Sequence, residues 1–459
     1  MSSAIRPRVA VVPTAGMGHL MPFLRLALML QRHGCSVTLI TAQPTTSKAE
    51  SAHISSFLSA FPQVDHFELQ LLPMPEEFDT STVDPFFLQF DRINRSIHQL
   101  LPILKEFSPP LSAIFLDLTL VANFVEIADE LGLPIYIPNT SSARFFALLS
   151  YLPELSSQPD FLRGAYSDVA IPGILPLPFS SIPPPFKDTS TVFTSTLIRN
   201  SRTISKARGI LMNNFEWFEE STLAALNGGR VLETLPPCIT VGPLEPYKLG
   251  NESSENWPWL DEQSSGSVIY VSFGSRTAMS TEQIRELAKA LKNSKHKFLW
   301  TVKTSKVDKD DKEDLSNVLG DRFLEETAGK GITLKQWVDQ EAILAHPAVG
   351  GFISHCGWNS VMEAAREGVP ILAWPLHGDQ RVNAEVVADA GLGIWDRGWG
   401  IGDKSLVRAD EIEGKIELLM TDTNLRASAR RVKEEAAKAV CRGGSSDRMI
   451  RDVVKCLVG

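Results

Sequence analysis

The chain has 459 residues, and at roughly 100 to 200 residues per domain this length predicts two or three domains. Hydrophobic residues make up 43% and charged residues 22%, which is typical of a globular protein and excludes a disordered or membrane-spanning chain. The net charge of −9 gives no reason to expect nucleic acid or an anionic membrane as a partner.

The cysteines and the first residues indicate the compartment. The five cysteines are scattered and form no CxxC pair, so we expect reduced thiols rather than a disulfide framework or a zinc site. The first 16 residues contain only a short apolar run before Pro13, far less than a signal peptide needs, and no stretch is long enough for a transmembrane helix. We therefore expect a cytoplasmic protein.

The first elements in chain order are typical of a βαβ unit. Residues 8–41 contain a β-branched run, a glycine-rich turn, an amphipathic helix and a second β-branched run. The same rhythm returns at 112–138, 266–302 and 349–375. Strands that alternate with helices predict an α/β protein with parallel sheets, which bind ligands beyond the carboxyl ends of their strands. The turn at 13–19 is not GxGxxG, so a dinucleotide-dependent oxidoreductase is not favoured.

Two segments of different composition separate these series. Residues 171–186 are proline-rich and are predicted to be a loop, and the polar stretch at 242–263 is predicted to link two domains. We therefore divide the chain into a domain at 1–242, a linker at 243–263, a domain at 264–440 and a C-terminal helix at 441–459.

Residues 337–380 read "WVDQEAILAHPAVGGFISHCGWNSVMEAAREGVPILAWPLHGDQ". This segment resembles the signature box of the plant UDP-dependent glycosyltransferases, which are family 1 enzymes of the GT-B fold. It has the opening Trp-x-x-Gln, the central His-Cys-Gly-Trp-Asn-Ser-x-x-Glu and the closing Asp-Gln at their spacings. The two-domain rhythm extends the resemblance over essentially the whole chain.

The resemblance implies two Rossmann-like domains whose parallel sheets face each other across a cleft. The N-terminal domain would bind the acceptor, the C-terminal domain would bind the UDP-sugar, and the C-terminal helix would pack back on the N-terminal domain. It implies no cofactor beyond UDP-glucose as the donor substrate, no metal, and a monomer.

The start and centre of the box suit a uridine. Trp337 offers a flat apolar face on which a base can stack. The backbone of Val338 and the side chain of Gln340 resemble the uracil and ribose contacts of the family. Glu363 can accept both ribose hydroxyls. Two alternatives stay open: Trp337 is a core residue, or Ser360 and Glu363 form a capping box at a helix start.

A helix start after "FISHC" presents backbone N–H groups beside Gly357 to a diphosphate. Side-chain donors would come from His355, Asn359 and Ser360, and Cys356 is interpreted as a buried packing residue. Five further positions resemble family ligands of the diphosphate or sugar, and one of these has an alternative. The set comprises Ser275, Thr140 (or an N-cap of the following helix), Asp379 and Gln380 as the clamp on the glucose hydroxyls, and Trp358 as support for the ring.

A phenol that attacks an anomeric carbon needs a base. His19 ends the first glycine-rich turn beyond the first strand, and the family match implies the catalytic base there. Asp117 ends another apolar run and resembles its carboxylate partner, which would orient the ring and stabilise its cation. The alternatives are a structural histidine and, for Asp117, an N-cap.

Several acceptor loops resemble the plant flavonoid C-glycosyltransferases. The motif Asp84-Pro85-Phe86 is one of them, together with Phe145, Phe186 and Arg276 in similar segments. Asp84 would hold a phenol, the three phenylalanines would wall the acceptor ring and Arg276 would attract a phenolate. The alternatives are core positions for the phenylalanines and a turn start for Asp84.

The sequence therefore predicts an inverting, metal-independent UDP-glucosyltransferase that forms aromatic C-glucosides on phloretin-like or 2-hydroxyflavanone polyphenols. An O-glucosyltransferase with the same fold and donor residues is the main alternative. A non-catalytic UDP-sugar sensor and a UDP-sugar epimerase are further alternatives, and the aromatic acceptor loops disfavour the epimerase.

Overall fold

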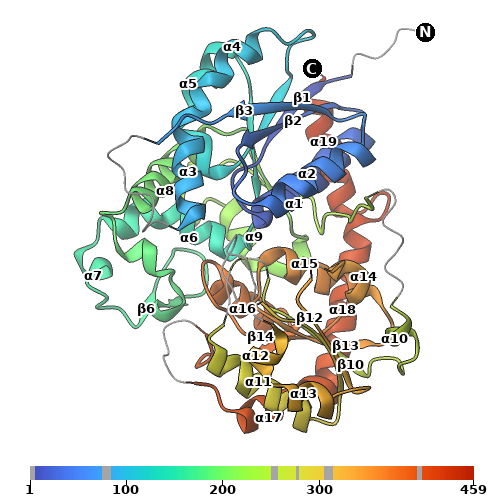
Figure 1. Cartoon of the computed structure of the whole chain (residues 1–459). Coiled ribbons are helices and arrows are strands. Elements are labelled where there is room, and N and C mark those ends of the chain that lie inside the picture. The colour runs from blue at the N-terminus through green and yellow to red at the C-terminus, as the bar shows by residue number, and fades with distance from the viewer. Residues whose placement is uncertain are drawn as a thin grey trace. The chain divides into compact units, whose positions relative to one another are not determined.

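The structure is a computed structural model that describes residues 6–74, 84–249, 257–274, 276, 279–303, 314–336, 338–400 and 406–458. It divides the chain into unit 1, which contains Met1–Gly250 and Lys438–Gly459, and unit 2, which contains Asn251–Ala437. Each unit is an α/β domain built on its own parallel sheet (Figure 1). The segment predicted as a linker, 243–263, is not all loop, because α10 (Pro258–Asp261) forms within it.

Unit 1 contains a parallel sheet of seven strands in the order β3-β2-β1-β4-β5-β8-β9. The order reverses between β1 and β4, which pair with Val12 opposite Leu116. The strands are β1 (Arg8–Val12), β2 (Ser36–Gln43), β3 (Asp65–Gln70), β4 (Ala113–Leu116), β5 (Ile135–Asn139), β8 (Gly209–Met212) and β9 (Cys238–Thr240).

The helices of unit 1 follow the strands, as the βαβ pattern predicts. They are α1 (Met17–Arg32), α2 (Lys48–Ala60), α3 (Pro85–Ser96), α4 (Leu100–Lys105), α5 (Val121–Leu131), α6 (Ala143–Ser156), α7 (Pro159–Leu162), α8 (Val192–Thr203), α9 (Glu220–Asn227) and α19 (Ser445–Cys456). Short 3-10 turns are η2 (Ile97–Gln99), η3 (Leu118–Leu120), η4 (Phe179–Ser181), η5 (Pro184–Lys187), η6 (Ile204–Lys206) and η7 (Glu216–Glu219).

The proline-rich segment at 171–186 is mostly irregular but not entirely loop. It contributes β7 (Leu177–Pro178), which pairs antiparallel with β6 (Asp168–Val169), and the turns η4 and η5.

Helix α19 belongs to the core of unit 1, although it lies at the far end of the sequence (Figure 1). Its apolar residues Ile450, Val453 and Val454 are buried in one cluster with residues of α1, β1 and β2. The hydroxyl of Ser446 donates to the carbonyl of Gly242 at 2.7 Å. Burial of such an apolar face stabilises the unit by roughly 25 cal/mol per Å² of apolar surface.

Unit 2 contains a parallel sheet of six strands in the order β12-β11-β10-β13-β14-β15, and this order reverses between β10 and β13. The strands are β10 (Val268–Ser272), β11 (Lys297–Thr301), β12 (Gly331–Leu334), β13 (Val349–Ser354), β14 (Ile371–Ala373) and β15 (Gly393–Trp395). Besides α10, its helices are α11 (Thr281–Asn293), α12 (Leu315–Leu319), α13 (Asp321–Glu326), α14 (Gln340–Ala345), α15 (Trp358–Glu367), α16 (Gln380–Asp389), α17 (Ala409–Thr421) and α18 (Thr423–Val440), whose last residues count with unit 1.

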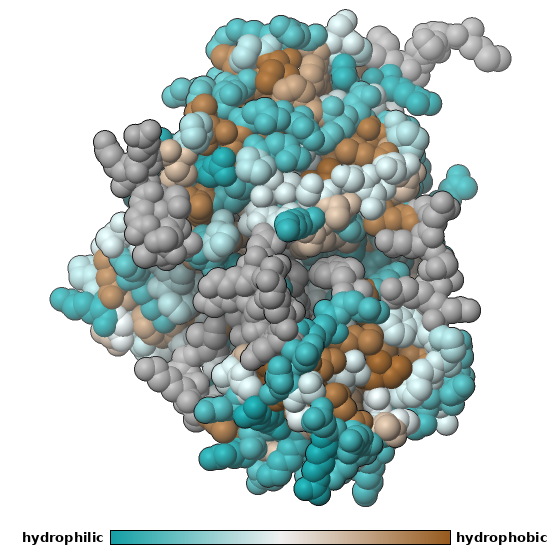
Figure 2. Space-filling view, viewed as in Figure 1, coloured by the Kyte–Doolittle hydropathy of each residue, from teal (hydrophilic) through white to brown (hydrophobic). Residues whose placement is uncertain are grey.

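The face of the protein seen in Figure 2 is mainly hydrophilic, with hydrophobic residues in scattered patches. Across the ranges that the structure describes, no helix combines the length and the apolar character needed to cross a membrane.

Candidate active site

Some of the predicted functional residues follow the strands at which the sheet order of each unit reverses: His19 follows β1, Asp117 follows β4 and His355 follows β13. In unit 1 these strands are β1 and β4, and in unit 2 they are β10 and β13, which pair with Ser272 opposite Ser354. Open α/β sheets bind ligands beyond the carboxyl ends of the strands at such a reversal. Each unit therefore has one edge that is suited to a ligand.

His19 lies in the first turn of α1, directly beyond β1. The N-cap residue Gly16 has a φ of 93°, which glycine adopts readily, and this lets the chain turn sharply from the strand into the helix. The backbone N–H of His19 donates to the carbonyl of Gly16 at 3.0 Å. The imidazole is 25% exposed, so a small molecule can reach it.

Asp117 follows β4 and lies beside His19. Its Oδ2 is 2.6 Å from Nδ1 of His19, and its side chain is only 2% exposed. Burial would raise the pKa of this carboxyl, but the charge of His19 and hydrogen bonds from His19 and Thr119 together lower it. An ionised Asp117 can only accept a hydrogen bond, so it keeps the proton of His19 on Nδ1 and leaves Nε2 as the basic nitrogen.

The N-cap alternative for Asp117 also holds. Its Oδ1 accepts from the backbone N–H of Thr119 at 3.0 Å and from the hydroxyl of Thr119 at 2.7 Å, and it caps η3. The two carboxylate oxygens thus serve different partners, and the cap fixes the carboxylate that orients the imidazole.

Phe86 supplies an apolar surface next to His19. The ring centroids of the two residues are 6.1 Å apart, and a Cβ atom at Gly16 would lie 3.5 Å from the Phe86 ring. Asp84 does more than start a turn: it caps α3, with Oδ1 accepting the backbone N–H of Phe86 at 2.9 Å. The cap therefore sets the position of Phe86 beside the imidazole.

The remaining predicted residues of unit 1 are the acceptor residues Phe145 and Phe186 and the donor residue Thr140. Phe145 and Phe186 pack against each other with ring centroids 5.8 Å apart and are 8% and 3% exposed, as the core alternative expects. Thr140 is half-buried between β5 and α6. The N-cap alternative for Thr140 is wrong, because Ser142 caps α6 by accepting the N–H of Phe145 at 3.1 Å.

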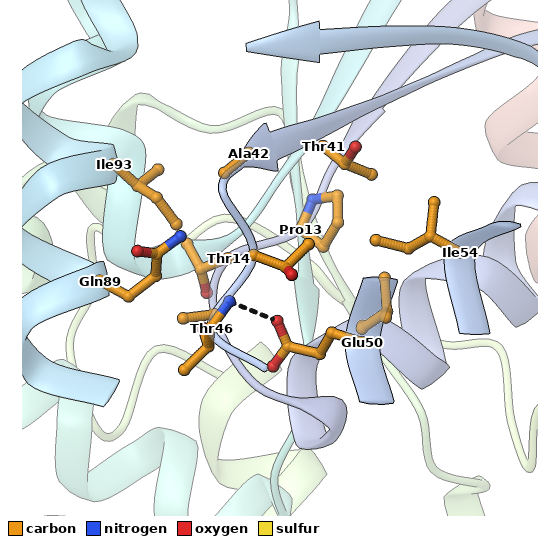
Figure 3. A pocket seen from close by; sticks show the side chains of 12 residues that line it. Pro13, Thr14, Thr41, Ala42, Thr46, Glu50, Ile54, Gln89 and Ile93 are labelled. Carbon is orange, nitrogen blue, oxygen red and sulfur yellow. Dashed lines mark hydrogen bonds between the residues drawn. The ribbon is translucent and has the colours of Figure 1, made fainter. Parts of the chain in front are cut away.

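A small cavity of about 20 Å³ also lies at this end of the sheet of unit 1 (Figure 3). Thr14, Thr46, Glu50 and Gln89 are among its lining residues, and the backbone N–H of Thr46 donates to Glu50 at 3.1 Å. This volume suits about one water molecule, whereas ligand pockets are roughly 300 Å³ or more. The cavity is therefore too small to be the acceptor site.

In unit 2, His355 directly follows β13 and lies between two glycines. An added Cβ would be 2.6 Å from its Nε2 at Gly274 and 2.5 Å at Gly357, so the ring occupies this place only because both residues lack side chains. Burial lowers the pKa of His355 to about 4. The imidazole is therefore neutral at pH 7 and can offer a diphosphate an N–H group but no positive charge.

The start of α15 leaves backbone donors for an anion. Its N-cap is Gly357, which has no side chain to satisfy the first N–H groups, and its first turn contains no acidic residue. The preceding Cys356 has a φ of 62°, a conformation that side chains other than glycine rarely adopt. Cys356 is fully buried and burial raises the pKa of its thiol, which agrees with a packing role.

The capping-box alternative for Ser360 and Glu363 is wrong. The helix begins two residues before Ser360, so both residues lie inside α15 and neither is at its N-cap. Instead, Nε2 of Gln340 donates to Oγ of Ser360 at 2.9 Å and to Oε2 of Glu363 at 2.6 Å. Three predicted donor-binding side chains are thus joined by hydrogen bonds.

The loop before α16 leads into Asp379 and Gln380, which were predicted to bind the glucose hydroxyls, but the two side chains have different surroundings. The side-chain oxygen of Gln380 already accepts the backbone N–H groups of Leu376 and His377 at 2.7 and 2.9 Å. Gln380 is 3% exposed and Trp358 is 2% exposed, so both shape the loop and offer little surface to a sugar. Asp379 is half-buried and remains accessible.

His377, which was not predicted to be part of the site, lies next to Gln380 with their Nε2 atoms 3.4 Å apart. Burial and then the positive charge of Arg276 lower its pKa to about 3. Arg276, predicted to bind the acceptor, lies in unit 2. Asn359 is half-buried and Val338 is 5% exposed, while Trp337 and Ser275 lie outside the described residues.

The chain is similar to known proteins in both sequence and structure. Residues 232–397 match the family model described as UDP-glucoronosyl and UDP-glucosyl transferase. The chain is 46% identical to UDP-glycosyltransferase 708G2 of Citrus unshiu, over 98% of this chain and 96% of that protein. It is 44% identical to UDP-glycosyltransferase CGT of Oryza sativa subsp. indica, over 99% and 97% of the two chains.

The structure is also similar to the crystal structure of LpCGTa in complex with UDP, with a TM-score of 0.87, 44% identity and coverage of 99% of both chains. The two parallel-sheet Rossmann-like domains are thus those of the GT-B fold, and the signature box lies in the unit expected to bind the donor. The chain belongs to the UDP-glycosyltransferase family and is an enzyme of that family.

Proposed function

We propose that this enzyme is an inverting, metal-independent UDP-glucose-dependent C-glucosyltransferase that acts on a polyphenol of the phloretin or 2-hydroxyflavanone class. The observation that carries the proposal is the 2.6 Å contact between Nδ1 of His19 and Oδ2 of Asp117 beside the ring of Phe86. The relatives whose names contain CGT support attack by a carbon atom of the acceptor rather than by an oxygen atom.

The pair provides the base for the acceptor. Nε2 of His19 takes the proton of a phenol, and the ionised Asp117 stabilises the imidazolium that results. Phe86 gives the phenol ring an apolar face next to the imidazole, which favours a flat aromatic acceptor over a sugar or an aliphatic alcohol.

The phenolate then uses its ring carbon. Its electron pair moves to the carbon ortho to the oxygen, and this carbon forms a bond to the anomeric carbon of glucose. The bond between the anomeric carbon and the UDP oxygen breaks, and its electron pair leaves with UDP. Loss of the proton from the attacked ring carbon restores the aromatic ring. Attack opposite the leaving group converts an α-linked sugar into a β-linked product.

Unit 2 stabilises the leaving group with dipoles. The N-terminus of α15 and the neutral His355 offer N–H groups to the diphosphate. These N–H groups would stabilise the negative charge that develops on UDP without a metal ion. Glu363 and Gln340 would bind the ribose, and Asp379 would bind the glucose hydroxyls.

The test is incubation of the purified enzyme with UDP-glucose and phloretin, followed by mass spectrometry of the product. We expect a glucoside that resists both acid hydrolysis and β-glucosidase, with fragmentation across the sugar ring. A product that acid or β-glucosidase returns to phloretin would identify an O-glucosyltransferase instead. The same assay with His19→Ala shows whether any product depends on the proposed base.

A further inference from the structure

Asn383 is a buried residue that connects two parts of the donor-binding edge of unit 2. It lies on α16 and is 0% exposed. Its Nδ2 donates to the carbonyl of Cys356 at 3.0 Å and to Oδ2 of Asp379 at 2.8 Å. One amide group thus binds both the residue just before the N-cap of α15 and the residue proposed to contact glucose.

The first partner is held in an unfavourable backbone conformation. Cys356 has its φ of 62° immediately before Gly357, so its geometry sets the direction in which α15 begins. The N–H of Cys356 donates to Oγ of Ser354 at 3.2 Å, and Asn383 binds its carbonyl from the other side. Without Asn383, this carbonyl would lose the side-chain donor that helps to hold the strained residue.

The second partner, Asp379, does not make the hydrogen bond that is usual for an aspartate at its position. Asp379 occupies the N-cap position of α16 but makes no side-chain cap hydrogen bond. An aspartate at this position normally accepts an N–H of its own helix. Here its carboxylate accepts from Asn383, one turn further on, which fixes the side chain in a different direction.

The amide orientation is set by these partners. Both are acceptors, so the NH₂ group must face them, and Oδ1 of Asn383 is buried with no hydrogen-bond partner among the described residues. A buried acceptor without a partner is destabilising. An apolar side chain would avoid that cost, so the two N–H bonds explain why an amide occupies the site.

We infer that Asn383 is a positioning residue that fixes the diphosphate-binding start of α15 and the sugar-binding carboxylate of Asp379 relative to each other. This inference rests on the proposed contact of Asp379 with glucose. It acts through its two partners and does not touch the substrate itself.

The experiment uses the full-length enzyme with Asn383→Asp, which keeps the shape but replaces both donors with acceptors, and with Asn383→Ala. Calorimetry gives the dissociation constants for UDP and UDP-glucose, and steady-state kinetics give KM for both substrates. We expect UDP-glucose to bind roughly 10- to 100-fold more weakly, UDP to lose less affinity, and KM for the acceptor to stay within about twofold.

Gln283→Ala is the matched control. Gln283 also makes two side-chain hydrogen bonds to backbone in unit 2, both with Val407 at 3.0 Å, but contacts neither Cys356 nor Asp379 in those bonds. We expect its ratio of UDP to UDP-glucose affinity to match the wild type. An equal change in Gln283→Ala and Asn383→Ala would mean general loosening and would overturn the inference.

A double-mutant cycle with Asp379→Ala tests the route of action. If Asn383 acts on the sugar through Asp379, adding Asn383→Ala to Asp379→Ala changes the affinity ratio no further. Fully additive effects would overturn the inference while leaving the sugar contact intact. An unchanged ratio in Asp379→Ala alone would instead refute the proposed sugar contact, and the inference with it.

Discussion

In unit 1 the two strands at the reversal of the sheet lead to a histidine and an ionised aspartate that share a short hydrogen bond. In unit 2 the equivalent strands lead to glycines and to a histidine that burial keeps neutral. The reversal of the sheet order therefore leads to different chemical groups in the two units. Unit 1 can move a proton, whereas unit 2 provides fixed N–H groups and shape.

This difference predicts two classes of variant. Changes at the reversal in unit 1 should reduce the rate constant of the chemical step, because they remove proton transfer. Changes at the reversal in unit 2 should weaken donor binding, because they disturb the frame around a phosphate or a ribose. The following predictions test this division, starting with the largest effect.

Replacement of the proposed base in His19→Ala should lower kcat on the order of a thousandfold, within the range that general base catalysis supplies. The dissociation constant for UDP should stay within about twofold. Single-turnover kinetics and calorimetry measure the two quantities. A variant that retains more than a tenth of wild-type kcat would show that another group takes the proton.

Gly357→Ala would place a Cβ 2.5 Å from Nε2 of His355, so the imidazole must move away from the start of α15. We expect KM for UDP-glucose to rise roughly 10- to 100-fold, because a hydrogen bond to a charged phosphate is lost or misaligned.

Gly414→Ala is the control for this change. Gly414 lies inside α17 of the same unit, and an added Cβ meets nothing within 4 Å. Its KM should equal that of the wild type, and the alanine should slightly stabilise the helix. A comparable rise in KM in both variants would contradict the role assigned to His355.

Glu363→Ala removes the carboxylate that Gln340 holds at 2.6 Å. We expect KM for UDP-glucose to rise about tenfold through loss of the ribose contact, with a smaller change in KM for the acceptor. Initial-rate measurements with each substrate varied in turn give both constants. Equal changes in the two values would count against the ribose contact.

The neutral state of His355 also predicts a pH dependence of stability. In the unfolded chain the imidazole of His355 binds a proton below its ordinary pKa of 6.5. In the folded protein, burial lowers this pKa to about 4. Lowering the pH across this interval therefore favours the unfolded chain, by up to about 3 kcal/mol in the free energy of unfolding. The contribution of the neutral His355 to the free energy of unfolding is fully present above pH 6.5 and is lost as the pH falls towards 4.

Urea unfolding at several pH values measures this effect. His355→Asn has no titrating group there, so its free energy of unfolding should fall less steeply between pH 6.5 and 4 than that of the wild type. Parallel curves for the two proteins would show that His355 is protonated in the fold.

Much of the fold was predictable because its signals are local. Alternating β-branched runs and amphipathic helices indicate parallel sheets wherever they occur in the chain. His19 and Asp117 each follow a strand, and the structure makes these strands neighbours. The pairing of their side chains then follows from topology, because the carboxyl ends of adjacent parallel strands lie at one edge.

The details that sequence did not predict depend on which of several possible partners each side chain binds. The pattern Ser-x-x-Glu suits a capping box, but Cys356 and Gly357 start α15 earlier and move both residues inside the helix. The side-chain oxygen of Gln380 is used by its own loop, and the partners of Asn383 come from two separate elements. Spacing along the chain contains no information about such choices.

The position of α19 has a consequence for the order in which the protein folds during synthesis. The core of unit 1 includes Ile450, Val453 and Val454, so it is incomplete until these three residues have left the ribosome. Unit 2 is continuous in sequence and lacks nothing once Ala437 has emerged. Unit 2 can therefore finish folding first, whereas unit 1 completes its core only once α19 has been made.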